Sequence, residues 1–285
     1  MKWVAREASK VLHLVYQVAV YVHTRWKIRT AYRLSFVLDM LDIFFGVAAY
    51  FMLGSWLTSY AGQYLAEYGE NYASFLIIGM IANQYFRASY ELFYLMVSSK
   101  YWTNELTLFL MSKRGSLAMV LETLAVVYID TTLYALLVFF FGFVVIGAPL
   151  APRVDYLLLA VVMLLSVAAI LSVSLVSASM FFLLDAKQGL EPVSWVVSML
   201  TPFFAGVYYP LEVLPESLQP LAWCLPQSHG LAAIRKVALK GAGLSDIFDH
   251  VVFLSLFTLV VALVGTALYK YSLRRALKIG DLPHW

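Results

Sequence analysis

Long runs of apolar residues, separated by short polar segments, make up most of this 285-residue chain. Uninterrupted runs of more than about eighteen mainly apolar residues are typical of helices that span a membrane. The pattern therefore predicts an all-α integral membrane protein with six transmembrane helices. We place them at 34–58, 73–97, 117–146, 155–184, 193–211 and 250–270.

The positive charges indicate which side each connecting segment occupies. Fourteen Lys and Arg residues fall in segments on one side, and four fall on the other. Because cytoplasmic loops carry the excess of Lys and Arg, both termini are predicted to be cytoplasmic, in a multi-pass protein of the cell (inner or plasma) membrane. The domains that follow are a cytoplasmic N-terminal segment at 1–33, a transmembrane domain at 34–270 and a cytoplasmic tail at 271–285.

Within the N-terminal segment, apolar residues gather on one side of a possible helix, which predicts an amphipathic helix lying in the membrane interface. These residues are Val11, Leu14, Val15, Val18 and Val22.

Composition agrees with a membrane protein. Hydrophobic residues make up 62% of the chain and charged residues only 13%, against about 25% in a soluble domain. The net charge of +3 is small and does not suggest nucleic-acid binding. The single cysteine, Cys224, excludes an internal disulfide, and the five scattered histidines predict no metal site.

Ionisable residues inside predicted spans are costly and usually have a partner or face a cavity. Arg87 and Glu91 lie on the second span, and Glu122 and Asp130 on the third. Depth along the helices places Arg87 level with Asp130, which predicts a structural ion pair between them. The alternative is that Arg87 lines a path and meets an anionic group of a substrate.

Two further carboxylates, Asp39 and Asp42, lie on one face near the start of the first span. They could form a cation or proton site. The plainer interpretation is that they stabilise a helix N-terminus near Arg29 and Arg33.

Prolines interrupt the segment between the fifth and sixth spans, on the predicted outer side. Pro210, Pro215, Pro220 and Pro226 are five or six residues apart, which leaves room for short helices between them. The spacing predicts two short helices that re-enter the outer leaflet. An ordinary extracellular loop is the alternative.

The same segment resembles the closing segment of the ABC-2 family of ATP-binding-cassette exporter permeases. The matching residues are Gly206, Pro210, Leu211, Glu212, Leu214, Pro215, Leu218, Pro220, Pro226 and Arg235. The resemblance implies an outer re-entrant helical hairpin at 210–235, with Pro210, Leu211, Glu212, Pro215, Pro220 and Pro226 at the outer mouth. A gate role for Glu212 rests on that resemblance alone, since a carboxylate there could equally cap a short helix.

A weaker match lies in the 98–116 loop, where residues 104–112 are similar to the cytoplasmic coupling segment of the family. The implied contacts to an ATPase come from Asn104, Glu105, Leu106, Thr107, Phe109 and Leu110. Asn104 stands where the family has Gly, Thr107 where it has Glu, and Lys113 where it has Pro.

No G-x-x-x-x-G-K-[ST] phosphate-binding loop occurs in the chain, so ATP and Mg would bind a separate subunit. The resemblance implies two copies of a nucleotide-binding ATPase and a second, identical permease copy in the lipid bilayer. The chain itself is then not an enzyme. It would export an amphipathic drug, a lipid-like molecule or a glycan. Candidates for the path, each of which could instead be packing, are Tyr85, Phe86, Phe203, Phe204, Tyr208 and Tyr209.

Two other functions stay open. An ion-coupled carrier could use Asp39, Asp42 and Asp130, although only one span is interrupted. A membrane-embedded lipid-modifying enzyme could use Ser228 and His229, the one adjacent nucleophile and base.

Overall fold

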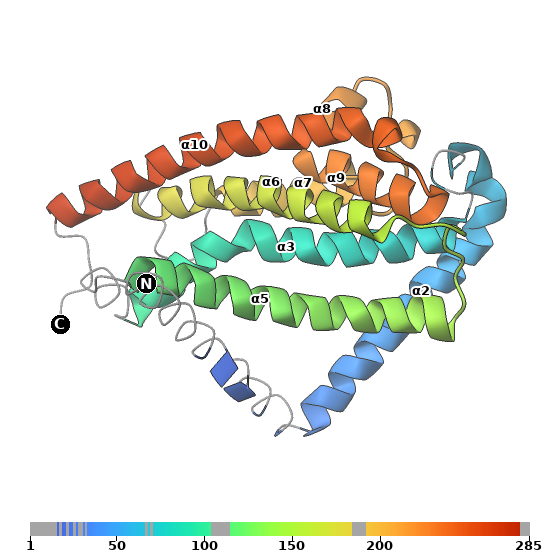
Figure 1. The fold of residues 1–285 in the computed structure, drawn as a ribbon, viewed down its shortest axis with the longest axis horizontal. Coiled ribbons are helices and arrows are strands. Elements are labelled where there is room, and N and C mark those ends of the chain that lie inside the picture. Colours follow the sequence, from blue (N-terminus) through green and yellow to red (C-terminus); the bar gives the residue numbers. More distant parts are fainter. Residues whose placement is uncertain are drawn as a thin grey trace, which may run out of the picture.

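The computed structural model describes residues 33–65, 71–103, 115–183 and 192–279, together with Tyr68 and isolated positions among the first 31 residues. These described residues form helices joined by short turns, and no strand occurs among them. Figure 1 shows the long helices other than the slanted blue one side by side along one axis. The fold is therefore all-α, as predicted.

A helix occupies the place of each predicted span. They are α2 (Arg33–Leu65), α3 (Tyr72–Trp102), α5 (Gly115–Phe139) with its π-helical extension η2 (Phe140–Val145), α6 (Tyr156–Leu183), α7 (Pro192–Phe204) and α10 (Phe248–Ile279). Among the described residues, four helical stretches are long and apolar enough to cross a membrane: Val37–Trp56, Thr123–Val145, Tyr156–Leu183 and Leu244–Ile279. The spans predicted on α3 and α7 stay predictions, because α3 carries charged residues along its middle and α7 has only 13 residues.

Two helices end at positions other than the predicted span ends. The fifth helix ends at Phe204 and not at residue 211, because Gly206 adopts a positive φ of 70° and Pro210 cannot continue a helix. The sixth helix continues to Ile279, nine residues beyond the predicted end at 270, into the segment predicted as a tail. Its last turns contain Arg, Ala, Leu and Lys, which favour helix whether or not lipid surrounds them.

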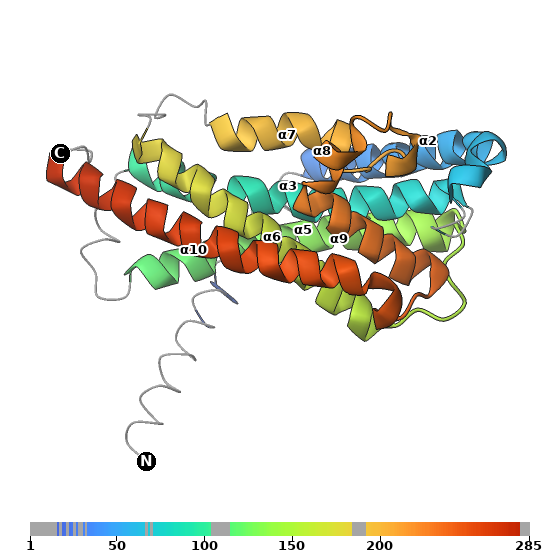
Figure 2. The same cartoon turned by 90° about the horizontal axis from the view of Figure 1, so that it is seen from above.

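Helix α6 lies at the centre of the bundle. It packs along α10 on one side and along α3 on the other, and Figures 1 and 2 both show it between these helices. Small residues allow this close approach. Five serines of α6 are buried, namely Ser166, Ser172, Ser174, Ser177 and Ser179.

Helix α2 is set apart from this arrangement. Figure 1 shows it slanting away from α5, so that its first turns stand clear of the bundle. Leu34, Leu38 and Phe45 are accordingly exposed.

The core is densest at the end of the bundle where α3 and α10 begin, which we call the hairpin end. There Phe75 and Phe86 of α3, Ile170 of α6 and Leu231 of α9 (Pro226–Arg235) are all fully buried in one cluster. The candidate functional site is built on this cluster.

Candidate functional site

The prolines of the hairpin, residues 210–235, stand where short helices begin. Pro210 precedes the 3-10 helix η3 (Leu211–Val213), Pro220 lies in the first turn of α8 (Gln219–Trp223), and Pro226 begins α9. Proline suits such positions because the first residues of a helix need no N–H partner within it. The two predicted short helices are thus present as α8 and α9. How deeply they enter a membrane stays a prediction.

Arg235, the last residue of α9, holds the hairpin to two other segments. Its side chain is 3% exposed. Nη1 donates to the carbonyl of Gly206 at 2.5 Å, and Nη2 donates to that of Val207 at 2.7 Å. Nε and Nη2 both donate to the carbonyl of Phe75 in α3, at 3.2 and 3.1 Å. One side chain therefore joins α9, the turn after α7 and the first part of α3.

The positive charge of Arg235 is stabilised mainly without direct ion pairing. Its Cζ lies 3.3 Å from the centre of the Phe75 ring, and a desolvated contact of this kind contributes about 2 kcal/mol. Burial lowers the pKa of Arg235 to about 9, and the nearby Tyr68, Tyr72 and Glu212 act in the opposite direction. The guanidinium thus remains charged at neutral pH.

Two glycines make room for Arg235. Gly206 has φ of 70°, a left-handed conformation that turns the chain so that successive carbonyls face the guanidinium. At Gly79, a Cβ atom would lie 2.5 Å from Arg235 Nη2 and 2.6 Å from the carbonyl oxygen of Val207. A residue larger than Gly at position 79 would therefore displace the guanidinium.

Tyrosines on three segments fasten the same turn. The hydroxyl of Tyr72 donates to the carbonyl of Tyr208, and the ring of Tyr50 in α2 stacks on the ring of Tyr208 with centroids 5.9 Å apart. The hydroxyl of Tyr68 donates to Glu212 Oε1 at 3.3 Å. Glu212 thus accepts a bond from the segment before α3, and its predicted gate role stays a prediction.

A pair of histidines joins the hairpin to α10. His229 Nδ1 lies 3.0 Å from His250 Nδ1, and His229 Nε2 lies 2.9 Å from the carbonyl oxygen of Trp223. Because a carbonyl only accepts, we assign the hydrogen of neutral His229 to Nε2, which leaves its Nδ1 to accept from His250. Burial lowers the pKa of His229, although its bond to the Trp223 carbonyl partly offsets this. Burial therefore favours a neutral His229.

Ser228 and His229 do not face each other in a nucleophile and base arrangement. The Ser228 hydroxyl contacts the carbonyl oxygens of Ala222 at 2.6 Å and Phe204 at 3.0 Å. The ring of His229 instead packs on Phe253, with centroids 3.8 Å apart. Both side chains thus hold the hairpin together.

The charged residues midway along α3 and α5 have a different environment. Arg87 Nε lies 3.8 Å from Glu91 Oε1, one turn further along α3, and the side chains are 64% and 36% exposed. Asp130 of α5 is also exposed, and the side chain of Glu122 lies outside the described residues. The structure thus gives Arg87 a partner other than the predicted Asp130. The Arg87–Asp130 pair stays a prediction.

A polar face connects these charges to α2. The hydroxyl of Tyr134 on α5 is within electrostatic range of both Asp42 on α2 and Arg87 on α3. Tyr50, further along α2, interacts electrostatically with Tyr134 and Tyr208. Tyrosines therefore extend from the charged middle of the bundle to the turn held by Arg235.

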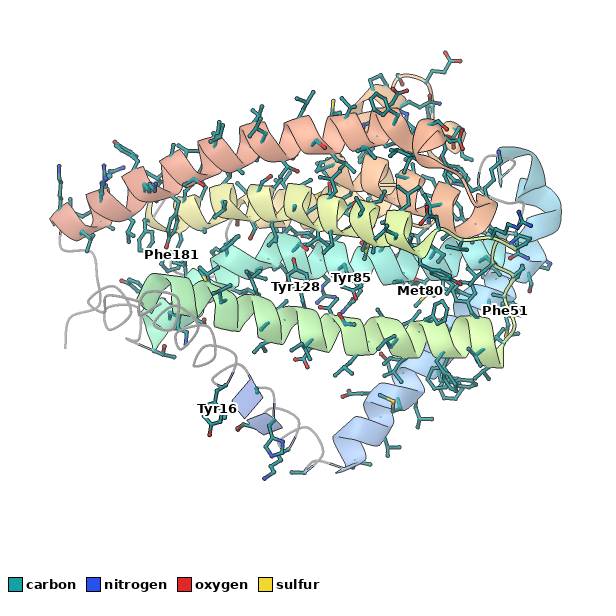
Figure 3. The ribbon with its side chains drawn as sticks, viewed as in Figure 1. Tyr16, Phe51, Met80, Tyr85, Tyr128 and Phe181 are labelled. Atoms are coloured by element: carbon teal, nitrogen blue, oxygen red, sulfur yellow. The ribbon has the colours of Figure 1, made fainter. Side chains whose placement is uncertain are left out.

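The six residues predicted to line a path fall into separate groups. Phe86 is fully buried in the core, as the packing alternative for the path candidates expects, and its assignment to a path stays a prediction. Tyr85 stacks on Tyr128 and donates to Thr132 Oγ1 at 2.9 Å, and Figure 3 shows Tyr85 and Tyr128 between α3 and α5. Phe203 is 60% exposed, and its carbonyl accepts from Tyr209. Phe204 and Tyr208 are half-buried beside the same turn.

The predicted coupling segment lies outside the described residues. Its six residues, Asn104, Glu105, Leu106, Thr107, Phe109 and Leu110, follow directly after the end of α3. Most of the predicted N-terminal interfacial helix and the last residues of the tail lie outside the description as well.

Sequence reasoning missed most of the residues that surround Arg235. Arg235 itself was noted only as a matching position and an outer charge, and Phe75, Gly79 and Tyr72 were not singled out. The available signal was that Arg235 is the only Lys or Arg within 210–235, although Lys236 follows it directly. The sequence alone could not show which distant carbonyls it would reach.

Comparison with known proteins gives limited support. No family model matches the chain. One curated protein, Nodulation protein J of Rhizobium leguminosarum bv. viciae, is 33% identical over 79 residues. The match covers 27% of this chain and 30% of that protein. The comparison therefore indicates a local similarity to this protein and does not establish a family.

Proposed function

We propose that this chain is the permease subunit of an ABC-2 type exporter, which moves a substrate outward while a separate subunit hydrolyses ATP. The four helical stretches of membrane-spanning length support a membrane protein. The local similarity to Nodulation protein J supports the proposal only at the level of transport.

One observation carries the proposal. The residues on which the family resemblance rests have distinct structural uses in the hairpin: Gly206 makes the turn, Pro210, Pro220 and Pro226 begin short helices, and Arg235 joins the ends. Gly206 and Arg235 are 29 positions apart, and the Gly206 carbonyl accepts a hydrogen bond from Arg235. Defined structural uses for the matching residues favour a shared architecture over a chance match.

In this proposal, α3 transmits motion along the bundle. Its first turns hold Arg235 through the Phe75 carbonyl, and it ends at Trp102, directly before the coupling segment. Two ATPase copies, with ATP and Mg bound to them, would press on the coupling segments of two identical permease chains. Closure of the ATPases would then rock α3 and displace the hairpin at the outer mouth.

The proposed substrate is an amphipathic drug, a lipid-like molecule or a glycan. The polar face of Asp42, Arg87, Tyr134 and Tyr50 offers hydroxyls, rings and charges along one direction. Aromatic rings can contact either apolar groups or sugars, so this face is compatible with each class.

Purification of the chain from its native membranes in mild detergent tests the proposal. We expect an ATPase subunit to co-purify in equal amount, and to be released when residues 104–112 are scrambled. Scrambling residues 280–285, also predicted to be cytoplasmic, is the matched control and should leave the ATPase bound.

Two results would contradict the proposal. One is a folded, dimeric chain that carries no ATPase under any mild condition. The other is equal loss of the ATPase from both scrambled variants, which would remove the coupling segment from the mechanism.

A further inference from the structure

An apolar groove lies between α3, α5 and α6 at the hairpin end. It encloses about 310 Å³. Ala82 of α3, Ala135 of α5 and Met163 of α6 line it, and Ile234 and Ala238 close it on the hairpin side. Along α3 it runs from Ile78 to Tyr85, about 10 Å at 1.5 Å per residue.

At the deep end of the groove, the hydroxyl of Tyr85 is already hydrogen-bonded within the protein. The Tyr85 hydroxyl donates to Thr132 Oγ1, and Thr132 Oγ1 donates to the carbonyl of Tyr128 at 2.6 Å. On the outer side of the groove, Leu136 and Tyr156 are 58% and 73% exposed. The groove is therefore apolar in character and open on its outer side.

A basic ledge borders the groove at the hairpin end. The linker between η2 and α6 contributes Leu150 and Val154 to the groove, and it packs on η4 (Lys236–Lys240) through a bond from Ala151 N to the Ala238 carbonyl at 3.2 Å. At Gly241, a Cβ atom would lie 2.6 Å from the Arg153 carbonyl oxygen. Linker and η4 thus form one continuous surface.

Positive charges concentrate on this ledge. Lys236 and Lys240 line a polar hollow of about 400 Å³ beside Gly241, and Arg153 is exposed on the adjoining linker. Asp246 shares the hollow, and its Oδ2 accepts from Gly243 N at 3.0 Å. Asp155 nearby accepts from Leu158 N at 3.0 Å, so both carboxylates cap helix starts. Arg153, Lys236 and Lys240 therefore outnumber the carboxylates of Asp155 and Asp246 on this surface.

We propose that a phospholipid with an anionic headgroup binds here, with one acyl chain in the groove and its phosphate on the ledge formed by Arg153, Lys236 and Lys240. Membrane-facing basic residues attract anionic lipid headgroups, and the apolar groove accepts the attached chain. Neither the transport function nor the direction of the chain in the membrane is needed for this binding. It would apply to whichever leaflet the hairpin end faces.

The test is native mass spectrometry of the purified chain, without any ATPase, after exchange into phosphatidylglycerol or phosphatidylcholine. One variant is Arg153→Gln/Lys236→Gln/Lys240→Gln, and a second, Ala160→Phe, fills the groove from the exposed side of α6. The matched controls are Arg274→Gln/Arg275→Gln/Lys278→Gln at the other end of α10, and Ala267→Phe on its exposed face.

We expect the unmodified chain and both controls to retain one phosphatidylglycerol. The triple ledge variant should bind it at least about tenfold more weakly, since each basic residue near the headgroup contributes. Ala160→Phe should lose phosphatidylglycerol and phosphatidylcholine alike, because it removes the space for the acyl chain.

Several results would overturn the proposal. If both the triple ledge variant and Ala160→Phe retained phosphatidylglycerol like the unmodified chain, there would be no such site. If the triple α10 control bound phosphatidylglycerol as weakly as the triple ledge variant, the binding would be general charge attraction. If inorganic phosphate alone bound the ledge as tightly as the lipid, and Ala160→Phe had no effect, the ligand would be a free anion. All these readouts are independent of ATPase binding, so failure of this proposal and failure of the exporter proposal are distinguishable.

Discussion

Two arginines, one packed against α3 and one within it, illustrate two uses of charge in this protein. Arg235 is 3% exposed, contacts three carbonyl oxygens and lies against the Phe75 ring of α3. Arg87, midway along α3, is 64% exposed and has an ion pair with Glu91 at 3.8 Å. Burial makes the contacts of Arg235 costly to lose, whereas exposed ion pairs contribute little to stability. The comparison indicates that Arg235 determines architecture and that Arg87 is available for interactions outside this chain.

The largest expected effect comes from Arg235→Lys. Lysine cannot reach the carbonyls of Phe75, Gly206 and Val207 together, so buried acceptors and a buried cation are left poorly satisfied. We expect the free energy of unfolding to fall by about 3 kcal/mol, measured by reversible unfolding in mixed micelles. Arg87→Lys is the control and should change it by less than about 0.5 kcal/mol. Equal effects of the two variants would end the distinction between the arginines.

Gly79→Ala should have the next largest effect. The added Cβ would lie 2.5 Å from Arg235 Nη2, so the guanidinium or α3 must shift, at a cost of about 2 kcal/mol in unfolding free energy. Gly46→Ala is the matched control, because nothing lies within 4 Å of its Cβ. Since alanine favours helix more than glycine does, the control should stabilise by up to about 1 kcal/mol. If Gly79→Ala left the free energy of unfolding unchanged, the contacts of Arg235 would not depend on the space at position 79.

The histidine pair predicts how the stability of the folded chain depends on pH. The folded chain protonates His229 only below its ordinary range, whereas the unfolded chain protonates it near pH 6.5. The unfolded state therefore binds more protons as the pH falls through about 6.5 toward the folded pKa, and stability is lost in that window. We expect the midpoint temperature of thermal unfolding to decrease as the pH is lowered from about 7.5 to about 5.5. The decrease should be smaller in His229→Gln. An identical pH profile in both proteins would contradict the assignment of neutral His229.

Arg87→Gln should have the smallest effect on stability. Its ion pair is exposed, so we expect a change of less than about 0.5 kcal/mol in unfolding free energy. If the face of α3 that carries Arg87 lines the proposed path, ATP-dependent efflux should nevertheless change in Arg87→Gln. Glu91→Gln, which removes the partner on the same helix, is the control for loss of the ion pair. A destabilisation by Arg87→Gln comparable to that of Arg235→Lys would show that Arg87 too is structural.

The sequence predicted the helices well because apolar run length and proline spacing are local properties of the chain. All six predicted spans coincide with helices, and among the described residues four helical stretches qualify as membrane-spanning by length and composition. The helix ends differ from the predicted span ends at Phe204 and Ile279, where a turn or a polar helical extension decides the end. The prolines also predicted short helices, because a proline is tolerated in the first turn of a helix and disrupts a helix interior.

The candidate site was predicted less completely. Phe86 looked available as an aromatic residue beside Tyr85, but neighbouring positions on a helix point in different directions, and only packing shows which one is buried. Ser228 and His229 looked like a possible reactive pair, yet they bond to different groups. In both cases adjacency in sequence did not predict adjacency of side chains.

What the sequence alone determined was the class of protein, the positions of its helices and the segment on which a functional resemblance rests. Only the tertiary structure decided which charges are architectural. Arg235 reaches Phe75, 160 positions away, and the space for it depends on Gly79. Burial and hydrogen bonding depend on which distant atoms meet, whereas helix formation depends on neighbours along the chain.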